Sequence, residues 1–283
     1  MTNGSNKWDM LTYTTYSEAG GVGKTTLASN LADAHGQHDR DVLVIDLDPQ
    51  NGSLTYLLGV DAPRDDSNAD NIARNLIDRP KGSFEDLILE TSFGFDLVPS
   101  HNMLENLADL LARAASMAED LDEEFERHDQ LRQVLLNADI PEEYDTIVVD
   151  PPATAGPHLY NAIGATRSLV IPLEPTGKGM QSIEGLQDVV QGFEDTVGVT
   201  VGVLAVVPNG VGRTTDQQRY LTRIRELGYD APVAIGERSS LFEGCWDKQT
   251  TAFAYVNEYR SRKRDHEMET LEQFMNSPAI LRR

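Results

Sequence analysis

Cysteine is nearly absent from this chain of 283 residues, in which Cys245 is the only one. A single cysteine excludes an internal disulfide, and it also excludes a metal cluster that several cysteines of one chain would hold. We therefore expect an intracellular protein that needs no oxidising compartment.

Long apolar runs are missing as well. The first residues contain no apolar stretch of signal-peptide length, and no window approaches the roughly 20 apolar residues that a membrane-spanning helix requires. The hydrophobic content of 40% is nevertheless sufficient for a real core, which excludes a disordered acidic tail. The composition therefore predicts a soluble, cytoplasmic protein.

Positive charge is scarce, because 24 Lys and Arg stand against 46 Asp and Glu and leave a net charge of −22. This balance resembles halophilic proteins, whose carboxylate-rich surfaces stay hydrated; an ordinary acidic protein is the alternative. Binding to a phosphate backbone depends on cations and weakens with salt, so any DNA contact has to be local.

Short apolar runs alternate with longer amphipathic segments along the chain. The expected strands are 10–16, 42–46, 95–99, 146–150, 168–173 and 201–208. The expected helices are 24–33, 103–136, 182–195 and 216–227. Residues 61–80 are expected to form a surface loop with a short helix, and the carboxylate run 118–130 is expected to be the solvated face of a long helix. The pattern predicts one α/β domain over 1–283, doubly wound, with a mostly parallel sheet and helices on both faces.

A glycine-rich run lies between the first expected strand and the first expected helix, which is the context of a phosphate-binding loop. Glycines let successive backbone N–H groups turn toward an anion, and the helix N-terminus adds partial positive charge. The expected nucleotide contacts are Gly20, Gly21, Val22, Gly23, Lys24, Thr25 and Thr26. Lys24 would reach the β- and γ-phosphate oxygens, and the Thr25 hydroxyl would ligate Mg²⁺. Glu18 stands where the general G-x-x-x-x-G-K-[ST] pattern begins with glycine.

Carboxylates follow two of the expected strands. Asp46 and Asp48 come at the end of 42–46 and, by the alternation of a strand, should point to the same side, beside the phosphates. Two close carboxylates facing a phosphate require a cation between them, although Asp48 as a simple turn cap is the alternative. Asp150 ends the strand 146–150, where an acid usually holds Mg²⁺ through water, and a strand-end cap is the alternative.

Together these motifs resemble the ParA/MinD family of deviant Walker A P-loop ATPases, and most closely its ParA or Soj branch. The similar segments follow the order of the family over residues 10–259 and leave 260–283 as a C-terminal helix or tail: "GGVGKTT", "DLDPQ", "FDLVPSHNMLENL", "YDTIVVDPPA", "VIPLEPTGKGMQSIEGL" and "VVPNGVGRTT". The nitrogenase-reductase branch does not fit, because Cys245 cannot supply two thiolates per subunit.

The resemblance implies the P-loop NTPase fold, with ATP and Mg²⁺ as cofactors. It implies that Lys24 and Asp48 are catalytic, with Asp48 positioning or activating the attacking water. Thr25, Asp48 and Asp150 would hold the metal. Asn209 would read adenine, although it is also a common turn former. No N-K-x-D motif for guanine is found there.

The resemblance also implies a reaction cycle. In this family an ATP-bound homodimer binds DNA non-specifically, and a ParB-like or adaptor protein then stimulates slow hydrolysis. The cycle partitions DNA or positions intracellular cargo, so a cytoplasmic protein that associates with the nucleoid is implied. Two alternatives stay open: a nucleotide-gated dimeric scaffold with negligible hydrolysis, and a MinD-like regulator that cycles on a membrane.

The chain departs from the family at one important position. The family signature K-G-G-x-G-K-T begins with a lysine that reaches the partner subunit's phosphates, and Ala19 stands there in this chain. A negatively charged transition state needs a cation to stabilise it, so another residue has to supply the missing positive charge, or the enzyme is slow. Lys178 and Arg213 are the candidate replacements, with an ordinary surface lysine as the alternative for Lys178.

Basic residues that could contact DNA are few. The candidates are Arg219, Arg223 and Arg238, and further basic residues are Arg225, Arg260, Arg262, Lys263 and Arg264. Such clusters are also found on ordinary solvated faces.

The C-terminal stretch 267–283 is predicted to form an amphipathic helix with Met268, Leu271 and Met275 on one face. Acidic flanks argue against a MinD-like membrane anchor, so we expect this helix to pack on the protein or on a partner.

Overall fold

The computed structural model describes residues 10–51, 53–60, 64–212, 214–260 and 265–280, with the side chains given up to residue 277. Its eight-stranded sheet has the order β3-β4-β2-β5-β1-β6-β7-β8. The strands are β1 (Leu11–Thr15), β2 (Val42–Asp46), β3 (Leu89–Glu90), β4 (Asp96–Val98), β5 (Thr146–Asp150), β6 (Ser168–Leu173), β7 (Gly202–Val211) and β8 (Ile235–Gly236). All neighbours are parallel except β3 and β4, which confirms the mostly parallel sheet.

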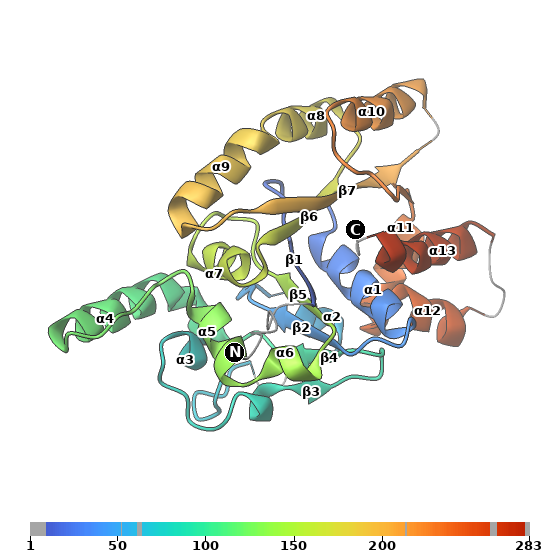
Figure 1. The fold of residues 1–283 in the computed structure, drawn as a ribbon. Coiled ribbons are helices and arrows are strands. Elements are labelled where there is room, and N and C mark those ends of the chain that lie inside the picture. The colour runs from blue at the N-terminus through green and yellow to red at the C-terminus, as the bar shows by residue number, and fades with distance from the viewer. Residues whose placement is uncertain (1–9, 52, 61–63, 213, 261–264, 281–283) are drawn as a thin grey trace, which may run out of the picture.

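Helices cover both faces of this sheet (Figure 1). The α-helices are α1 (Lys24–Gly36), α2 (Leu54–Leu57), α3 (Ile72–Leu76), α4 (Leu107–Asp120), α5 (Gln130–Asn137), α6 (Ile140–Glu143), α7 (Pro157–Thr166), α8 (Gly177–Glu184), α9 (Leu186–Val197), α10 (Thr215–Glu226), α11 (Ser239–Lys248), α12 (Ala252–Tyr259) and α13 (Asp265–Ile280). Two short 3₁₀ helices are η1 (Glu85–Leu87) and η2 (Asn102–Asn106). One face carries α1 and α11 to α13, and the other carries α3 to α10. The doubly wound architecture is therefore confirmed.

The inner strand β2 shows why its sequence is apolar from Val42 to Ile45. Val42 and Val44 pack on the α1 face, whereas Leu43 and Ile45 pack on the opposite face. Every residue of the strand is buried, because a parallel strand between two helix layers has no solvated side.

The long helix expected over 103–136 is interrupted. The helix α4 ends at Asp120, residues 121–129 form a turn in which Asp122 has φ 55°, and α5 begins at Gln130. Aspartate tolerates this left-handed conformation, which reverses the chain and brings Leu131 and Leu135 into the core. The run 118–130 is therefore not one helix face, which corrects the expectation, although most of its carboxylates are exposed to solvent as expected. The helix α4 extends from the body of the molecule (Figure 1).

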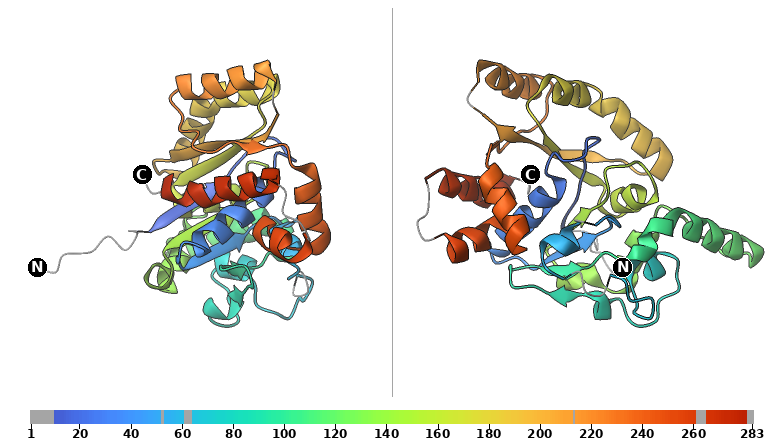
Figure 2. Two further views of the ribbon diagram at one scale, coloured as in Figure 1. Left: turned by 90° about the vertical axis from the view of Figure 1, so that its right-hand side faces the viewer. Right: turned by 180° about the vertical axis from the view of Figure 1, so that it is seen from behind.

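The C-terminal helix α13 packs on α1, in agreement with the prediction of a packing helix (Figure 2). Its side chains Leu271 and Phe274 are buried, and the Phe274 ring lies 6.3 Å from that of Phe253 in α12. The apolar face that a membrane anchor would need is therefore covered. Among the helices of the described residues, none combines the length and the apolar character required to cross a membrane.

Candidate nucleotide site

The phosphate loop connects the carboxyl end of β1 to the first turn of α1. Gly21 and Gly23 have φ angles of 79° and 89°, which side chains with a β-carbon rarely adopt. Gly23 is the N-cap of α1 and offers no side chain to cap it, so the helix begins without a side-chain acceptor for its N–H groups. A β-carbon on Gly20 or Gly21 would meet no other atom within 4 Å. An open loop at an uncapped helix N-terminus suits an anion such as a phosphate.

Asn209 lies against this loop rather than in a turn, because β7 extends to Val211. Its side-chain Nδ2 donates a 2.9 Å hydrogen bond to the Val22 carbonyl, and its Oδ1 accepts from the Gly210 N–H at 3.0 Å. A β-carbon on Gly23 would come within 2.5 Å of Asn209 Nδ2. Asn209 therefore contacts the phosphate loop directly, while its reading of adenine stays a prediction.

Asp150 lies beneath the loop at the end of β5. Its carboxylate accepts from Thr25 Oγ1 at 2.8 Å and from Thr15 Oγ1 at 2.6 Å. Burial raises the pKa of this carboxyl, and the nearby Lys24 ammonium opposes that rise. The predicted residues Lys24, Thr25 and Asp150 are thus brought together. Thr15 was not foreseen, because only the parallel pairing of β1 with β5 places it beside Asp150.

Asp46 does not face the phosphates together with Asp48, and this expectation was wrong. One Asp46 oxygen accepts from the Thr55 backbone N–H at 2.7 Å and from Thr55 Oγ1 at 2.6 Å, and the other accepts from the Asp48 N–H at 3.0 Å. The reason is that β2 ends at Asp46, so strand alternation does not extend to Asp48. Burial, together with the charge of Asp150, raises the pKa of Asp46 to about 7.

Asp48 is half-buried in the turn that follows β2. Its Oδ1 accepts from the Gln50 N–H at 2.9 Å, and its backbone carbonyl accepts from Ser100 Oγ at 2.6 Å. Burial is the main reason that the pKa of Asp150 is raised, and the negative charge of Asp48 adds a smaller contribution in the same direction. Sequence reasoning did not single out His158, whose Nε2 donates to the Leu104 carbonyl at 2.7 Å. Burial lowers the pKa of this imidazole, and the hydrogen bond to Leu104 and the charge of Asp48 oppose that shift.

No group of three or more His, Cys, Asp and Glu side chains that could hold a metal ion was found in the described ranges. Mg²⁺ usually binds through one or two carboxylates, waters and substrate phosphates rather than in an all-protein cage. The sparse donor set of Thr25, Asp48 and Asp150 fits that kind of site.

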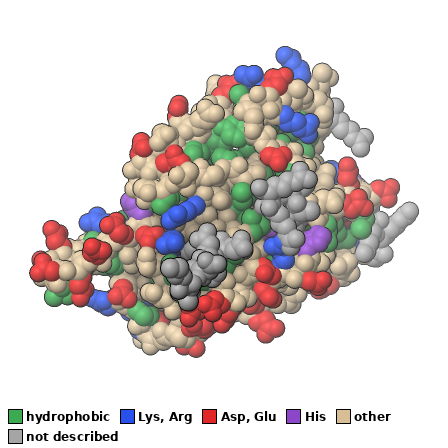
Figure 3. Space-filling view, in the orientation of Figure 1, with side chains coloured by type: hydrophobic (Ala, Val, Ile, Leu, Met, Phe, Trp, Pro, Cys, Tyr) green, Lys and Arg blue, Asp and Glu red, His purple; other side chains and the backbone are tan. Residues whose placement is uncertain are grey.

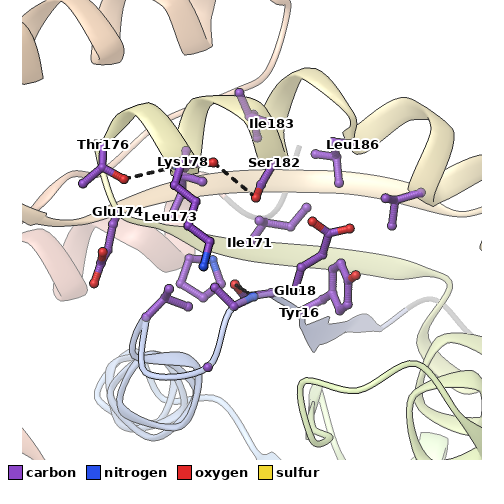
Figure 4. A pocket seen from close by; sticks show the side chains of 17 residues that line it. Tyr16, Glu18, Ile171, Leu173, Glu174, Thr176, Lys178, Ser182, Ile183 and Leu186 are labelled. Carbon is purple, nitrogen blue, oxygen red and sulfur yellow. Dashed lines mark hydrogen bonds between the residues drawn. The ribbon is translucent and has the colours of Figure 1, made fainter.

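Lys178 lies in the first turn of α8, beside the opening residues of the phosphate loop. It lines one pocket with Tyr16, Glu18 and Ala19, above apolar side chains of β6, α8 and α9. Figure 4 shows its side chain extending from α8 toward the loop of its own chain. Within the part of the chain that the structure describes, its ammonium group makes no hydrogen bond or ion pair. The other candidate cation, Arg213, lies outside the described residues.

The candidate DNA contacts differ in their surroundings. Arg219 is exposed and lies 3.7 Å from Asp216, while Arg223 pairs with Glu184 at 3.6 Å and with Glu226 at 3.5 Å. Figure 3 shows basic side chains among acidic ones over this edge of the molecule, at the top of the view. The acidic partners reduce the positive charge of this surface, but Arg219 remains exposed to solvent.

Arg238 is engaged within the protein. Its Nε donates to the His266 carbonyl at 3.0 Å and to Thr270 Oγ1 at 3.1 Å, and its Nη2 lies 3.4 Å from a Glu269 oxygen. It therefore ties α13 to the segment that follows β8, and a DNA contact at this residue stays a prediction. Arg262, Lys263 and Arg264 lie outside the described residues.

Comparison with known proteins supports the same family. Residues 12–201, about two thirds of the chain, match the family model described as an AAA domain. The chain belongs to the ParA/MinD-type P-loop ATPases.

Relatives of this ATPase include proteins named for two different tasks. Maintenance of carboxysome distribution protein A (McdA) of Synechococcus elongatus is 26% identical over 233 residues, which cover 79% of this chain and 84% of the relative. The chromosome-partitioning ATPase Soj of Thermus thermophilus is 31% identical over 169 residues, which cover 60% of this chain and 57% of Soj. An ATP complex of Cyanothece McdA has a TM-score of 0.75 at 22% identity and covers 96% of each chain, which shows a shared fold.

Proposed function

We propose that this chain is an ATP-dependent, dimerising ATPase of the ParA type that hydrolyses ATP to drive DNA partitioning or the positioning of an intracellular cargo. The observation that carries the proposal is the buried carboxylate of Asp150, held by Thr15 and Thr25 directly beneath an open phosphate loop. The relatives Soj and McdA, named for chromosome partitioning and for carboxysome distribution, support both outcomes of the cycle.

The residues present fit ATP with Mg²⁺. The glycines of the loop leave room for a phosphate chain, and Lys24 would bind its β- and γ-phosphate oxygens. Thr25, Asp48 and Asp150 would hold Mg²⁺, which neutralises phosphate charge when bound. The Asp48 carboxylate would orient the attacking water by accepting its hydrogen bond. Catalysis would then consist of positioning and charge stabilisation.

The test of hydrolysis is ATP turnover by the wild-type protein and by Asp48→Ala, each with and without double-stranded DNA. We expect slow turnover in the wild type and none above background in the variant. The alternative is a nucleotide-gated scaffold, which the missing lysine at Ala19 favours. Wild-type turnover equal to that of Asp48→Ala under every condition, together with ATP-dependent dimerisation, would establish the scaffold instead.

Lys178 is our candidate for the cation that Ala19 does not provide. Support comes from its place in the pocket beside Ala19 and from the lack of a competing partner among the described residues. A cation at the transition state would stabilise the spread negative charge of the transferred phosphoryl group. We expect Lys178→Ala to lower kcat while leaving the ATP affinity of the monomer nearly unchanged, and Lys178→Arg to retain part of the rate.

A mixing experiment separates a cation that acts within one chain from a cation supplied by the partner. In a heterodimer of Lys178→Ala and Asp48→Ala chains, a partner-supplied lysine would restore one complete site. A lysine that acts in its own chain would restore none. Following the family, we expect recovery of activity on mixing two inactive variants; absence of recovery, with heterodimers demonstrated, would assign Lys178 to its own phosphate loop.

Partners and location follow from the same proposal. We propose a homodimer in the ATP state, non-specific DNA as one surface partner, a ParB-like or adaptor protein that stimulates hydrolysis, and a cytoplasmic, nucleoid-associated location. A MinD-like membrane cycle is disfavoured, because Leu271 and Phe274 of α13 are buried in the core. ATP-dependent sedimentation with anionic liposomes would contradict that choice.

A further inference from the structure

A buried arginine lies under the turn that carries Asp48. Arg64 is only 3% exposed. Its Nε donates to Asn102 Oδ1 at 2.8 Å, and its Nη2 donates to the carbonyl of Pro49, the residue after Asp48. In return, the Asn102 N–H donates to the Arg64 carbonyl at 3.2 Å. The segment at Arg64 and the start of η2 are therefore joined to each other and to the Asp48 turn.

The turn is held at each step of its backbone. The Asp48 N–H donates to Asp46 at 3.0 Å, and the Asp48 carbonyl accepts from Ser100 Oγ at 2.6 Å. The next carbonyl, that of Pro49, accepts from Arg64. The Asp48 N–H is thus bonded within its own segment, to Asp46, and the Asp48 carbonyl is bonded to Ser100 in a distant one, which restrains the backbone that carries the carboxylate.

A structural contribution alone explains this arginine poorly. Burying a charged guanidinium costs free energy, and apolar side chains of similar size usually stabilise a core as well or better. What an arginine adds is a rigid set of directed donors. Here two of these donors, Nε and Nη2, are directed at Asn102 Oδ1 and at the Pro49 carbonyl beside Asp48, so they restrain the position of the turn.

We propose that Arg64 is a positioning residue for ATP hydrolysis, which acts by holding the Pro49 carbonyl and thereby the Asp48 carboxylate in place. The inference rests on the proposed function, in which Asp48 orients the attacking water. A displacement of about 1 Å at a reacting centre costs on the order of 100-fold in rate, so a loosened turn should slow hydrolysis without weakening nucleotide binding. In the proposed function the phosphate loop contacts the nucleotide itself, so ATP affinity measured without Mg²⁺ should not depend on Arg64.

The test compares four variants by kcat, KM, equilibrium ATP affinity and amide hydrogen exchange. We expect Arg64→Met to lower kcat about tenfold or more, with ATP affinity within about twofold of wild type. Arg64→Lys should recover part of kcat, because a lysine can reach one acceptor but not two in a fixed geometry. Ser100→Ala, which frees the Asp48 carbonyl, should lower kcat several-fold. Arg79→Met is the matched control, since Arg79 is a surface arginine paired with its neighbour Asp78 at 4.0 Å.

Hydrogen exchange supplies a readout that is independent of activity. We expect faster exchange in residues 46–51 of Arg64→Met and unchanged exchange in residues 17–26. Unchanged kcat in Arg64→Met overturns the proposal, and so does a parallel loss of kcat, ATP affinity and protection throughout the chain. If Arg64→Met does not fold, Ser100→Ala decides, and wild-type kcat in that variant overturns the proposal.

Failure of the proposed function has a different signature. Wild-type turnover no faster than that of Asp48→Ala contradicts hydrolysis itself. In that case exchange in residues 46–51 alone decides whether Arg64 holds the turn, and unchanged exchange there overturns the inference.

Discussion

Asn209 stands over Gly23, so that a β-carbon on this glycine would come within 2.5 Å of the Asn209 side-chain nitrogen. The same nitrogen donates to the Val22 carbonyl at 2.9 Å. A late strand of the sheet therefore supports the phosphate loop, although Val22 and Asn209 are 187 residues apart in sequence.

The first prediction concerns this contact. We expect Asn209→Ala to weaken ATP binding about tenfold, which corresponds to about 1.4 kcal/mol and to the loss of one or two hydrogen bonds. The preference for ATP over GTP should shrink as well, if Asn209 also reads adenine. Titration with fluorescent ATP and GTP analogues measures both, with the exposed Asn68→Ala as control. An equal loss of affinity for ATP and GTP would agree with a role of Asn209 in supporting the phosphate loop and would contradict a contact with adenine.

The second prediction concerns the metal. Asp150→Asn should raise the Mg²⁺ concentration needed for tight ATP binding about tenfold or more, because a carboxylate that orients the metal shell contributes 10- to 100-fold in affinity, by rough precedent. Binding of ATP in EDTA should change little. Asp145→Asn, the same substitution just before β5, is the control and should behave as wild type. A Mg²⁺ dependence that is identical in both variants would contradict a metal role for Asp150.

The third prediction is a pH dependence that arises from Asp46. Its pKa is about 7 in the folded protein because of burial and the charge of Asp150, against about 3.9 in an unfolded chain. The folded state binds this proton more tightly, so the contribution to stability is complete below about pH 4 and is lost as the pH rises through about 7. The difference of about three pKa units limits the contribution of Asp46 to the unfolding free energy to roughly 4 kcal/mol.

Urea unfolding without nucleotide or Mg²⁺, at several pH values, measures this effect. Between about pH 5 and 7 the unfolding free energy of the wild type should decline more steeply than that of Asp46→Asn, whose side chain does not titrate. Surface carboxylates contribute to both proteins and cancel in the comparison, whereas the coupling of Asp46 to Asp150 is part of the effect that is measured. Parallel pH profiles would show that Asp46 titrates normally.

The fourth prediction separates two arginines. Arg238→Ala should lower the unfolding free energy by about 1–2 kcal/mol, because it removes the hydrogen bonds to His266 and Thr270 that tie down α13. Arg219→Ala should leave stability unchanged, since its ion pair with Asp216 is exposed on both sides. Arg219→Ala should instead weaken DNA binding in the ATP state and reduce the slope of log affinity against log salt by about one. DNA affinity equal to wild type across salt concentrations would exclude Arg219 from the DNA surface.

Much of the fold could be predicted because its signals are local. The strands expected at 42–46, 146–150 and 168–173 coincide with β2, β5 and β6, since strands buried on both faces are continuous apolar runs. The long helix expected over 103–136 could not be corrected from the pattern, because its apolar spacing continues through the turn in which Asp122 takes a left-handed conformation. Such a reversal depends on what the following helix packs against.

The site divides in the same way. Sequence alone determined the phosphate loop, the order of the acids that follow the strands and the absence of the signature lysine at Ala19, because neighbouring residues carry this chemistry. Only the tertiary structure decided that the Asp46 carboxylate accepts hydrogen bonds from Thr55, that Arg64 donates to the Pro49 carbonyl beside Asp48, and that α13 packs on α1. The physical reason is that periodicity and composition specify local conformation and burial. A hydrogen bond between residues far apart in sequence depends on which segments the completed sheet brings together.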